Sequence, residues 1–441
     1  MLNQRRCLLC YLVMVVIVVS TFINCRGKSP SDNGNPNVDE IQLDSPVELT
    51  FWHRQTGHSE ELQQQIIDEF MAANPNIKIK AEFVGDYSKL YQKTLAAIQA
   101  GSPPDLVAAF ETQASEYYDA DALVPFDDYI SSKRYGLSEE ELRDFVPSFL
   151  AAAKFPQYSG KMLTFPYTKS VMVMYTNMDV LRSLGIDSPA ATWDDFLKHC
   201  RMAIAGGHQG YAFTGDASTF AAFVYSFGGE LISPDGKRPV LDDEATTRTL
   251  QLFETLGKEN LGYRITGDDD VNELLAGRAL YIIKSSIMLR RLTPGFGDNQ
   301  KWRVSIIPQM NLDRKTTVLF GANFAILKTT PEKQLAAWLF VKHFTQGDNT
   351  ARWGFDPANG YFPIRQSASS QPLAQPFLDN NPHFREALNI SQYARAEPNA
   401  RGWQEVRSAI EDSVTAVFTG KLTVQQAQQR LVEQANSVME H

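Results

Sequence analysis

The chain has 441 residues, of which 43% are hydrophobic and 21% charged, and its formal net charge is −9. This composition is that of a soluble globular protein with ample apolar residues for large cores, and the length suggests two or three domains. The acidic balance, with no basic stripe or Lys/Arg cluster, argues against a nucleic-acid partner.

The first 24 residues are predicted to be a secretory signal and not part of the globule. Arg5 and Arg6 precede an apolar run over residues 8–23. That run of 16 residues is short for a helix that must cross about 30 Å of hydrocarbon, so we favour cleavage before Cys25 over an uncleaved membrane anchor. Lipidation of the Cys25 thiol would then anchor the chain to the membrane.

Residues 25–46 are predicted to be a flexible tether, because they contain almost no apolar side chains. A tether behind a lipidated cysteine predicts a protein of the cell envelope that faces the periplasm or the extracellular side. Loss of residues 1–24 would remove two arginines and no acid, leaving 40 basic against 51 acidic residues and a net charge of −11.

The four cysteines do not indicate a disulfide. Cys7 and Cys10 would leave with the signal, and Cys25 would carry lipid. Cys200 is then alone, and we interpret it as a buried core thiol and not as a nucleophile.

Alternating strands and helices are predicted over residues 47–110. Apolar and polar residues alternate over 47–52 and 77–83, whereas 106–110 is an apolar run that suits a strand buried on both faces. We expect one helix between each pair of strands, the first capped by Ser59 and ended by Asn74-Pro75, the second over roughly residues 87–100.

This alternation predicts a parallel α/β sheet, and such sheets bind ligands at the carboxyl ends of their strands. Trp52, His53 and Glu111 would lie at those ends. The pattern therefore predicts a binding site there.

The rest of the chain continues the α/β pattern. The expected elements are a hairpin over 158–166, an apolar strand over 171–175, a helix capped by Thr192 and opened by Trp193, a strand-like run over 319–327 with Gly321 in its middle, a helix from Pro331 to about Thr345, and helices after 361–364 to the end.

No catalytic signature is found: G-x-S-x-G, G-x-x-x-x-G-K-[ST] and H-E-x-x-H are all absent. The seven histidines are scattered, and residues 268–270 lack the spacing of a calcium loop, so we expect no metal and no cofactor. Aromatic residues at loop positions suggest ligand contacts, because ring faces stack on the C–H faces of sugars and polyols, although most aromatics are core residues. These are Trp52, Tyr87, Trp193, Tyr361 and Trp403.

Taken in order, nine short segments resemble the family 1 extracellular solute-binding proteins of ABC importers. They are residues 47–53, 70–75, 101–106, 160–166, 175–177, 192–196, 275–279, 320–327 and 360–365. The resemblance implies a two-lobed α/β fold of the periplasmic-binding-protein type (type II), with a ligand cleft between the lobes and three interlobe crossings near residues 169, 321 and 362. One lobe would contain 47–168 and 322–361, the other 171–320 and 363–441.

The resemblance also implies the function of a monomeric substrate-binding lipoprotein. Such a protein captures a carbohydrate-type solute by cleft closure and delivers it to the membrane subunits of an ABC permease; it is not an enzyme. Residues 51–53, 85–87, 359–364 and 418–421 look most like members that bind sn-glycerol 3-phosphate. The expected ligand is glycerol 3-phosphate or a related glycerophosphodiester, and a neutral mono- or oligosaccharide is the alternative.

Carried over by position, the resemblance implies nine ligand-binding residues. Tyr87 would hydrogen-bond the ligand, Glu111 would accept hydroxyls, and Gly321 would offer its backbone N–H. Ser170 would donate to phosphate or hydroxyl, and Ser286 would be a second phosphate donor, with Ser285 nearly as good a match. Trp193 would form a wall, Tyr361 would close over the ligand, and Trp52 would lie at a strand end. Arg401 is nearest to the arginine clamp of the family, although an ungapped match places Asn399 there; Lys169 and Lys284 are alternative cations.

Two other functional classes are alternatives. A secreted carbohydrate-active enzyme could pair Glu111 with Asp105, but these bracket one strand and would stand roughly 20 Å apart, whereas glycosidase carboxylates lie about 5 to 10 Å apart. A ligand sensor that is presented to a membrane receptor would use the same fold and stays open.

Overall fold

The computed structural model describes residues 37–267 and 269–439. The predicted signal, the predicted lipidation site Cys25 and most of the predicted tether lie outside the described residues. Residues from Val38 onward belong to one compact unit. Among the described residues, no helix combines the length and the apolar character that a membrane span requires.

The first of two large sheets is built mainly from the N-terminal third of the chain. Its strand order is β2-β1-β3-β14-β4, with β7 also beside β14. β1 is parallel to β2 and β3, but β14 is antiparallel to its neighbours, so the predicted parallel sheet is mixed. The strands are β1 (Val47–His53), β2 (Ile77–Phe83), β3 (Leu106–Ala109), β4 (Leu123–Val124), β7 (Phe165–Pro166) and β14 (Asn323–Leu327).

The first sheet and its helices form what we call the first lobe. The helices are α1 (His58–Ala73), α2 (Tyr87–Gln99), α3 (Glu111–Asp119), α4 (Asp127–Ser131), α5 (Glu139–Arg143), α6 (Pro147–Ala152), α13 (Pro331–Phe344) and α14 (Gly347–Gly354). A short hairpin joins β5 (Lys154–Phe155) to β6 (Lys161–Met162). Gly57 and not Ser59 is the N-cap of α1, since the helix begins at His58. Ser59 lies in its first turn, and its hydroxyl donates to Asn359 Oδ1 at 2.6 Å.

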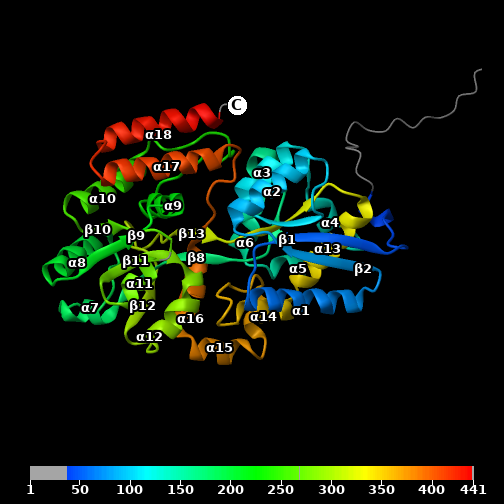
Figure 1. The fold of residues 1–441 in the computed structure, drawn as a ribbon, viewed down its shortest axis with the longest axis horizontal. Helices are drawn as coiled ribbons and strands as arrows, with labels where there is room; N and C mark the ends of the chain where they lie inside the picture. Colours follow the sequence, from blue (N-terminus) through cyan, green and yellow to red (C-terminus); the bar gives the residue numbers. More distant parts are fainter. Residues whose placement is uncertain (1–36, 268, 440–441) are drawn as a thin grey trace, which may run out of the picture. The chain divides into compact units, whose positions relative to one another are not determined.

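The second sheet has the strand order β10-β9-β11-β8-β13-β15, with β12 also beside β8. With its helices it forms the second lobe, and the two lobes occupy opposite halves of Figure 1. Its strands are β8 (Ser170–Asn177), β9 (Gln209–Phe213), β10 (Gly262–Arg264), β11 (Ala279–Ser285), β12 (Trp302–Ser305), β13 (Thr317–Phe320) and β15 (Ala394–Arg395).

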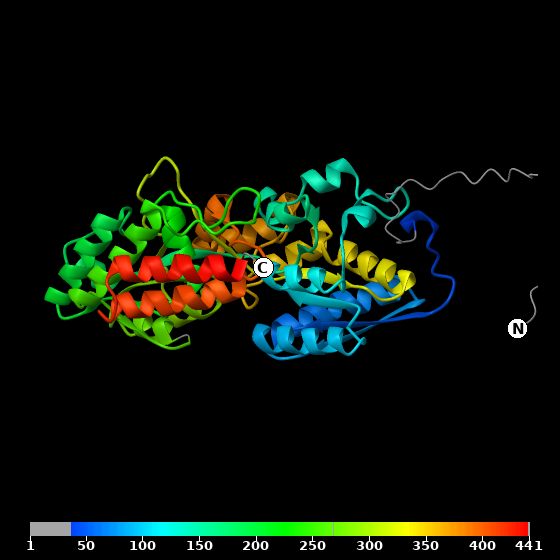
Figure 2. The ribbon, with the colours of Figure 1, turned by 90° about the horizontal axis from the view of Figure 1, so that it is seen from above.

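Helices cover the second sheet on its faces, and α17 and α18 pack side by side on α10 (Figure 1). Figure 2 shows the same pair of helices from above. The helices of this lobe are α7 (Met178–Ser183), α8 (Trp193–Ala205), α9 (Ala217–Ser226), α10 (Glu244–Lys258), α11 (Asp269–Leu275), α12 (Leu289–Phe296), α16 (Pro382–Ile390), α17 (Trp403–Phe418) and α18 (Val424–Met439), with α15 (Ala374–Asn380) preceding α16. Thr192 caps α8 as predicted, accepting from the Asp195 N–H at 3.2 Å. Cys200 is buried in this lobe, and burial raises the pKa of its thiol.

The chain passes between the lobes at segments that hydrogen-bond to one another. β7 and β8 lie in different sheets, and so do β13 and β14, so the run predicted as one strand over 319–327 is two strands. The Thr168 N–H donates to Ala322 O at 3.0 Å, and the Phe362 N–H donates to Lys169 O at 2.7 Å. These bonds hold the crossing segments together.

The lobe ranges within the chain stay a prediction. Beyond the third crossing, Arg365 still contacts first-lobe groups: it donates to Thr345 O and pairs with Asp144 at 3.4 Å. α16, in contrast, packs on β12 and β8. We therefore propose that the second lobe resumes after Arg365, by the start of α16.

Two buried histidines predict a loss of stability in acid. Burial lowers the pKa of His53 and of His383 to about 4, from an ordinary value of 6.5. Since the unfolded chain binds protons at the higher pKa, the free energy of unfolding should fall as the pH drops from about 6.5 to 4, by on the order of 3 kcal/mol for each histidine. Urea unfolding of the wild type and of His383→Gln at pH 7 and pH 4.5 measures this effect. The variant should lose less stability than the wild type, and equal losses would contradict the assignment.

Candidate ligand-binding site

A cavity of about 450 Å³ lies between the lobes. The first lobe contributes α2 and the start of α3, and the second lobe contributes the end of β13, the start of α9, the segment before α17 and α17 itself. The lining residues are Tyr87, Ser88, Tyr91, Gln92, Phe110, Glu111, Thr112, Gln113, Ser218, Leu319, Phe320, Gly321, Glu397, Pro398, Gln404 and Arg407. Three of the predicted residues, Tyr87, Glu111 and Gly321, are among them, and their binding roles stay predictions.

Glu111 is fixed at the cavity wall by two donors. It opens α3 at the carboxyl end of β3, and its Oε1 accepts from Asn323 Nδ2 at 2.8 Å and from Lys169 Nζ at 3.2 Å. The Lys169 side chain is fully buried, and its ammonium also donates to Gly321 O at 3.3 Å. Burial lowers the pKa of Lys169, while the Glu111 carboxylate opposes that shift. The pair therefore brings a carboxylate to the cavity and balances its charge from behind.

Aromatic rings form the wall beside Glu111. The rings of Tyr87 and Phe110 are 4.3 Å apart at their centroids, and the Arg54 guanidinium lies 4.9 Å from the Tyr87 centroid. Burial and the nearby phenol of Tyr361 raise the pKa of Tyr87, so this hydroxyl stays protonated. Tyr361 itself is buried and stacks on Trp353, with 6.0 Å between the ring centroids, behind the cavity lining.

An arginine that the sequence analysis did not single out lines the opposite wall. Arg407, in the second turn of α17, donates to the Glu397 carboxylate and, at 3.2 Å, to the Ser218 hydroxyl. Burial lowers the pKa of Arg407, but the nearby Glu397 carboxylate outweighs this effect, so the pKa is raised overall. A charged residue four positions after Trp403, among the buried Val406 and Ile410 of the same helix, was the available sequence signal.

Four predicted residues belong to side-chain clusters outside the cavity lining. Trp52 Nε1 donates to Glu82 at 3.1 Å, and the Lys93 ammonium lies 4.0 Å from its ring centroid. Trp193 packs on Phe223 in the second lobe and donates to Ser226 at 2.9 Å. The hydroxyls of Ser170 and Ser285 are 2.9 Å apart, and Ser286 Oγ accepts from the Val171 N–H at 3.1 Å.

Two side chains that the sequence suggested as anion-binding cations, Arg401 and Lys284, also lie outside the cavity lining. The Arg401 side chain is 65% exposed and its Nε is 3.7 Å from Asp119 Oδ2, on α3 of the first lobe. Lys284 pairs with Asp270 at 2.9 Å. Asn399 O accepts from Gln157 Nε2 at 2.8 Å, which ties the segment before α17 to the first lobe.

Asp105, which the alternative enzyme hypothesis would pair with Glu111, lies at the other end of β3. It accepts from the Thr50 N–H at 2.9 Å and pairs with Lys333 at 3.2 Å. Within residues 37–267 and 269–439, no three His, Cys, Asp or Glu side chains gather in a way that could hold a metal ion.

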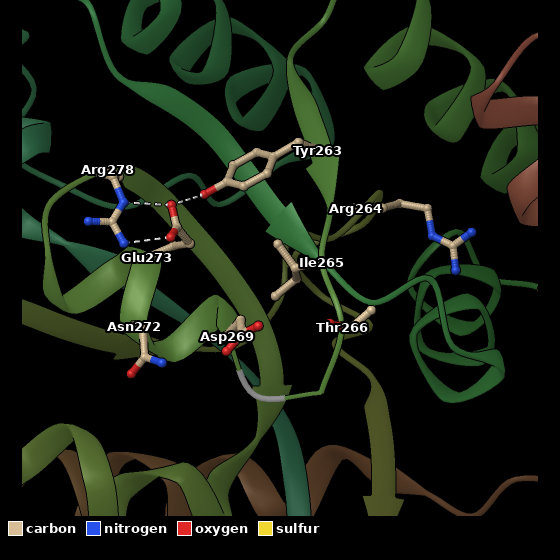
Figure 3. Close-up of a pocket in the computed structure, with 8 residues that line it drawn as sticks. All are labelled: Tyr263, Arg264, Ile265, Thr266, Asp269, Asn272, Glu273 and Arg278. Atoms are coloured by element: carbon tan, nitrogen blue, oxygen red, sulfur yellow. Dashed lines mark hydrogen bonds and ion pairs between the residues drawn. The ribbon is translucent and has the colours of Figure 1, made fainter.

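A second hollow, of about 740 Å³, lies on the second lobe alone, between the end of β10 and α11 (Figure 3). Three of its polar groups bind one another: Glu273 accepts from Arg278 at 2.6 Å and from the Tyr263 hydroxyl at 2.7 Å. These two hydrogen bonds lower the pKa of Glu273 to about 2. Because the hollow receives no residue from the first lobe, we take the cavity between the lobes as the candidate site.

Two lobes with a lined cavity between them are typical of solute-binding proteins. Residues 65–386 match the family described as bacterial extracellular solute-binding protein, and the chain belongs to that family. The predicted family resemblance is thereby confirmed. The sn-glycerol-3-phosphate-binding periplasmic protein UgpB of Escherichia coli (strain K12) is 23% identical over 415 residues, covering 89% of this chain and 92% of that protein.

Solved structures of similar proteins confirm the predicted two-lobed fold. UgpB from Mycobacterium tuberculosis in complex with glycerophosphocholine superposes with a TM-score of 0.77 at 21% identity, covering 90% of this chain and 99% of that one. The cyclic alpha-maltosyl-1,6-maltose binding protein from Arthrobacter globiformis has a TM-score of 0.77 at 18% identity, with 90% and 100% covered.

Proposed function

We propose that this protein captures glycerol 3-phosphate or a related glycerophosphodiester in the cavity between its lobes and delivers it to the membrane subunits of an ABC permease. The observation that carries the proposal is one cavity lined by Tyr87, Glu111 and Gly321, three residues for which the family resemblance implied ligand contacts. The relatives that bind such solutes, as their names state, support the ligand class.

Recognition would combine ring stacking with hydrogen bonds from fixed groups. The rings of Tyr87 and Phe110 would pack on the C–H faces of the glycerol or sugar moiety, while Glu111 would accept its hydroxyls. Because Lys169 and Asn323 both bind Oε1 of Glu111, its Oε2 would serve the ligand. Rotation about the crossing segments would close the lobes, as in periplasmic binding proteins, and no bond of the ligand would be made or broken.

The cellular setting is part of the same proposal. The protein would be a monomer anchored through lipid on Cys25 and held by its tether at the outer face of a membrane. Mass spectrometry of the protein purified from its native membrane should find a chain that begins at a modified Cys25. An intact Met1 would contradict the proposed anchor.

A neutral mono- or oligosaccharide is the second candidate ligand, and one observation favours it. The arginine that lines the cavity, Arg407, already binds the carboxylate of Glu397. Its charge is therefore balanced before any ligand enters.

A thermal-shift series on the purified protein tests the two ligand classes. The compounds are glycerol 3-phosphate, glycerophosphocholine, maltose, trehalose and glucose. A ligand at a hundred times its dissociation constant adds about 2.7 kcal/mol to the free energy of unfolding, which raises the midpoint clearly. A rise with the phosphorylated compounds alone supports the first candidate, a rise with a sugar alone supports the second, and no rise with any compound argues against both.

Replacing Tyr87 with alanine should weaken binding of whichever compound raises the midpoint. Loss of the ring face and of the hydroxyl together should cost about 1–3 kcal/mol, or roughly 5- to 150-fold in affinity. Tyr263→Ala, the same change in the hollow of Figure 3, is the matched control and should leave affinity unchanged. Isothermal titration calorimetry measures both; a loss in the control but not in Tyr87→Ala would place the site in the other hollow.

A further inference from the structure

Part of the cavity wall is a seat for an anion, and a side chain of the protein itself occupies it. The seat consists of the Arg407 guanidinium and the Ser218 hydroxyl, in the first turn of α9. Arg407 Nη1 and Nη2 each donate to Ser218 Oγ at 3.2 Å. The Glu397 carboxylate accepts from Ser218 through Oε1 and from Arg407 through Oε2.

These groups are of the kind that bind phosphate. A guanidinium offers a planar fork of donors that fits carboxylate and phosphate oxygens alike. The N–H groups and the dipole of a helix N-terminus also favour a negative charge. All three side chains line the cavity, so a ligand that fills it would lie beside the seat.

The backbone around Glu397 is held on both sides, which keeps its carboxylate at the seat. Ala396 O accepts from the Tyr225 hydroxyl at 3.0 Å, and Asn399 O accepts from Gln157 Nε2 at 2.8 Å. Pro398 between them is buried. Glu397 is thus a built-in part of the wall.

The charges around the seat oppose a second anion. Besides Glu397, the carboxylates of Asp216 and Glu411 act on Arg407. Asp216 caps α9, accepting from the Thr219 N–H at 2.9 Å, and Glu411 accepts from the Ala217 N–H at 3.3 Å. A phosphate placed here would meet three carboxylates around one guanidinium, and like charges at short range repel.

We propose that Glu397 is a specificity residue that occupies the anion seat and excludes anionic groups from this end of the cavity. The part of the ligand that lies against Glu397 and Arg407 is uncharged or cationic, and any phosphate is held elsewhere in the cavity. This inference rests on the proposed function only in taking the cavity as the ligand site; occupation of the seat can be tested without knowing the ligand.

Inorganic phosphate is the probe. We expect Glu397→Gln and Glu397→Ala to bind phosphate at least tenfold more tightly than the wild type in calorimetric titrations at constant ionic strength. The gain should vanish in Glu397→Gln combined with Arg407→Gln. Glu259→Gln, which removes one charge from the exposed Arg201–Glu259 pair of the same lobe, is the matched control and should show no gain.

A second measurement compares melting temperatures in phosphate and in chloride at equal ionic strength. In the wild type, any saturable rise specific to phosphate should persist in Arg407→Gln, because such a phosphate is held elsewhere in the cavity. A rise that Arg407→Gln abolishes would overturn the proposal, and so would equal phosphate affinity in the wild type and in folded Glu397 variants, or a gain that persists in the double variant.

The outcomes separate this inference from the proposed function. A wild type that binds a compound of the thermal-shift series, with no phosphate gain in the Glu397 variants, contradicts the inference alone. Variants that gain phosphate binding, in a protein that binds none of those compounds, support the seat and contradict the proposed ligands.

Discussion

Replacing Gly321 with alanine is expected to lower the free energy of unfolding by more than about 3 kcal/mol and to weaken ligand binding. Gly321 has a φ of +114°, and a Cβ placed on it would lie 1.7 Å from Thr168 O. The new methyl group would force apart two of the segments that cross between the lobes, because its closest neighbours are backbone atoms and not a flexible side chain. Urea unfolding measures the loss.

Gly420→Ala is the matched control for this substitution. Gly420 also has a positive φ, +69°, but a Cβ there would meet no atom within 4 Å. That variant should pay only the backbone strain of a left-handed residue, about 1–2 kcal/mol. Equal losses in the two variants would show that the contact with Thr168 does not matter.

Replacing Lys169 with methionine should be comparably damaging, by about 3–5 kcal/mol. The substitution removes the buried ammonium and leaves the Glu111 carboxylate, whose side chain is only 15% exposed, without its countercharge. The measurement is again the free energy of unfolding in urea.

The double variant Lys169→Met with Glu111→Gln distinguishes charge from packing. Without the carboxylate, the missing ammonium should cost less, so the double variant should be more stable than Lys169→Met alone. If the two are equally unstable, the loss comes from the changed shape of the side chain and not from the ion pair.

Much of the first lobe could be predicted from the sequence, because its elements form from neighbouring residues. Alternating polarity marks β1 and β2, and Asn74 ends α1 as expected. The predictions that were wrong concern residues whose strand partners lie far away in the sequence. The run over 319–327 has the polarity of one strand, but its halves pair with β8 in one lobe and β3 in the other.

Strand pairing between distant residues was also missed near the end of the chain. Residues after 364 were expected to be helical, yet β15 at 394–395 pairs with β13, and residues 396–400 after it belong to no helix or strand. Local periodicity carries no information on pairing between residues about 77 positions apart, such as Thr317 and Ala394.

The candidate site was predictable to a similar extent. Tyr87 and Glu111 follow the ends of predicted strands, and Gly321 stands where the backbone needs a glycine, so local sequence was enough to select them. All three line the cavity. Trp193 begins a helix as expected, but the packing of α8 on α9 decides which way its ring points. Glu397 and Arg407 belong to no motif, and only the fold brings their charges to the cavity wall.

The position of β14 has a consequence for the order in which the parts of the protein can fold. β14 pairs with β3 on one side and β4 on the other, so the first sheet lacks an inner strand until the chain is free to fold as far as residue 327. Until then, β3 and β4 present unpaired edges. The second sheet needs β15 in the same way, but that strand only adds to its border. The lobe whose strands come first in the chain therefore depends, for its centre, on residues that lie some two hundred positions further along.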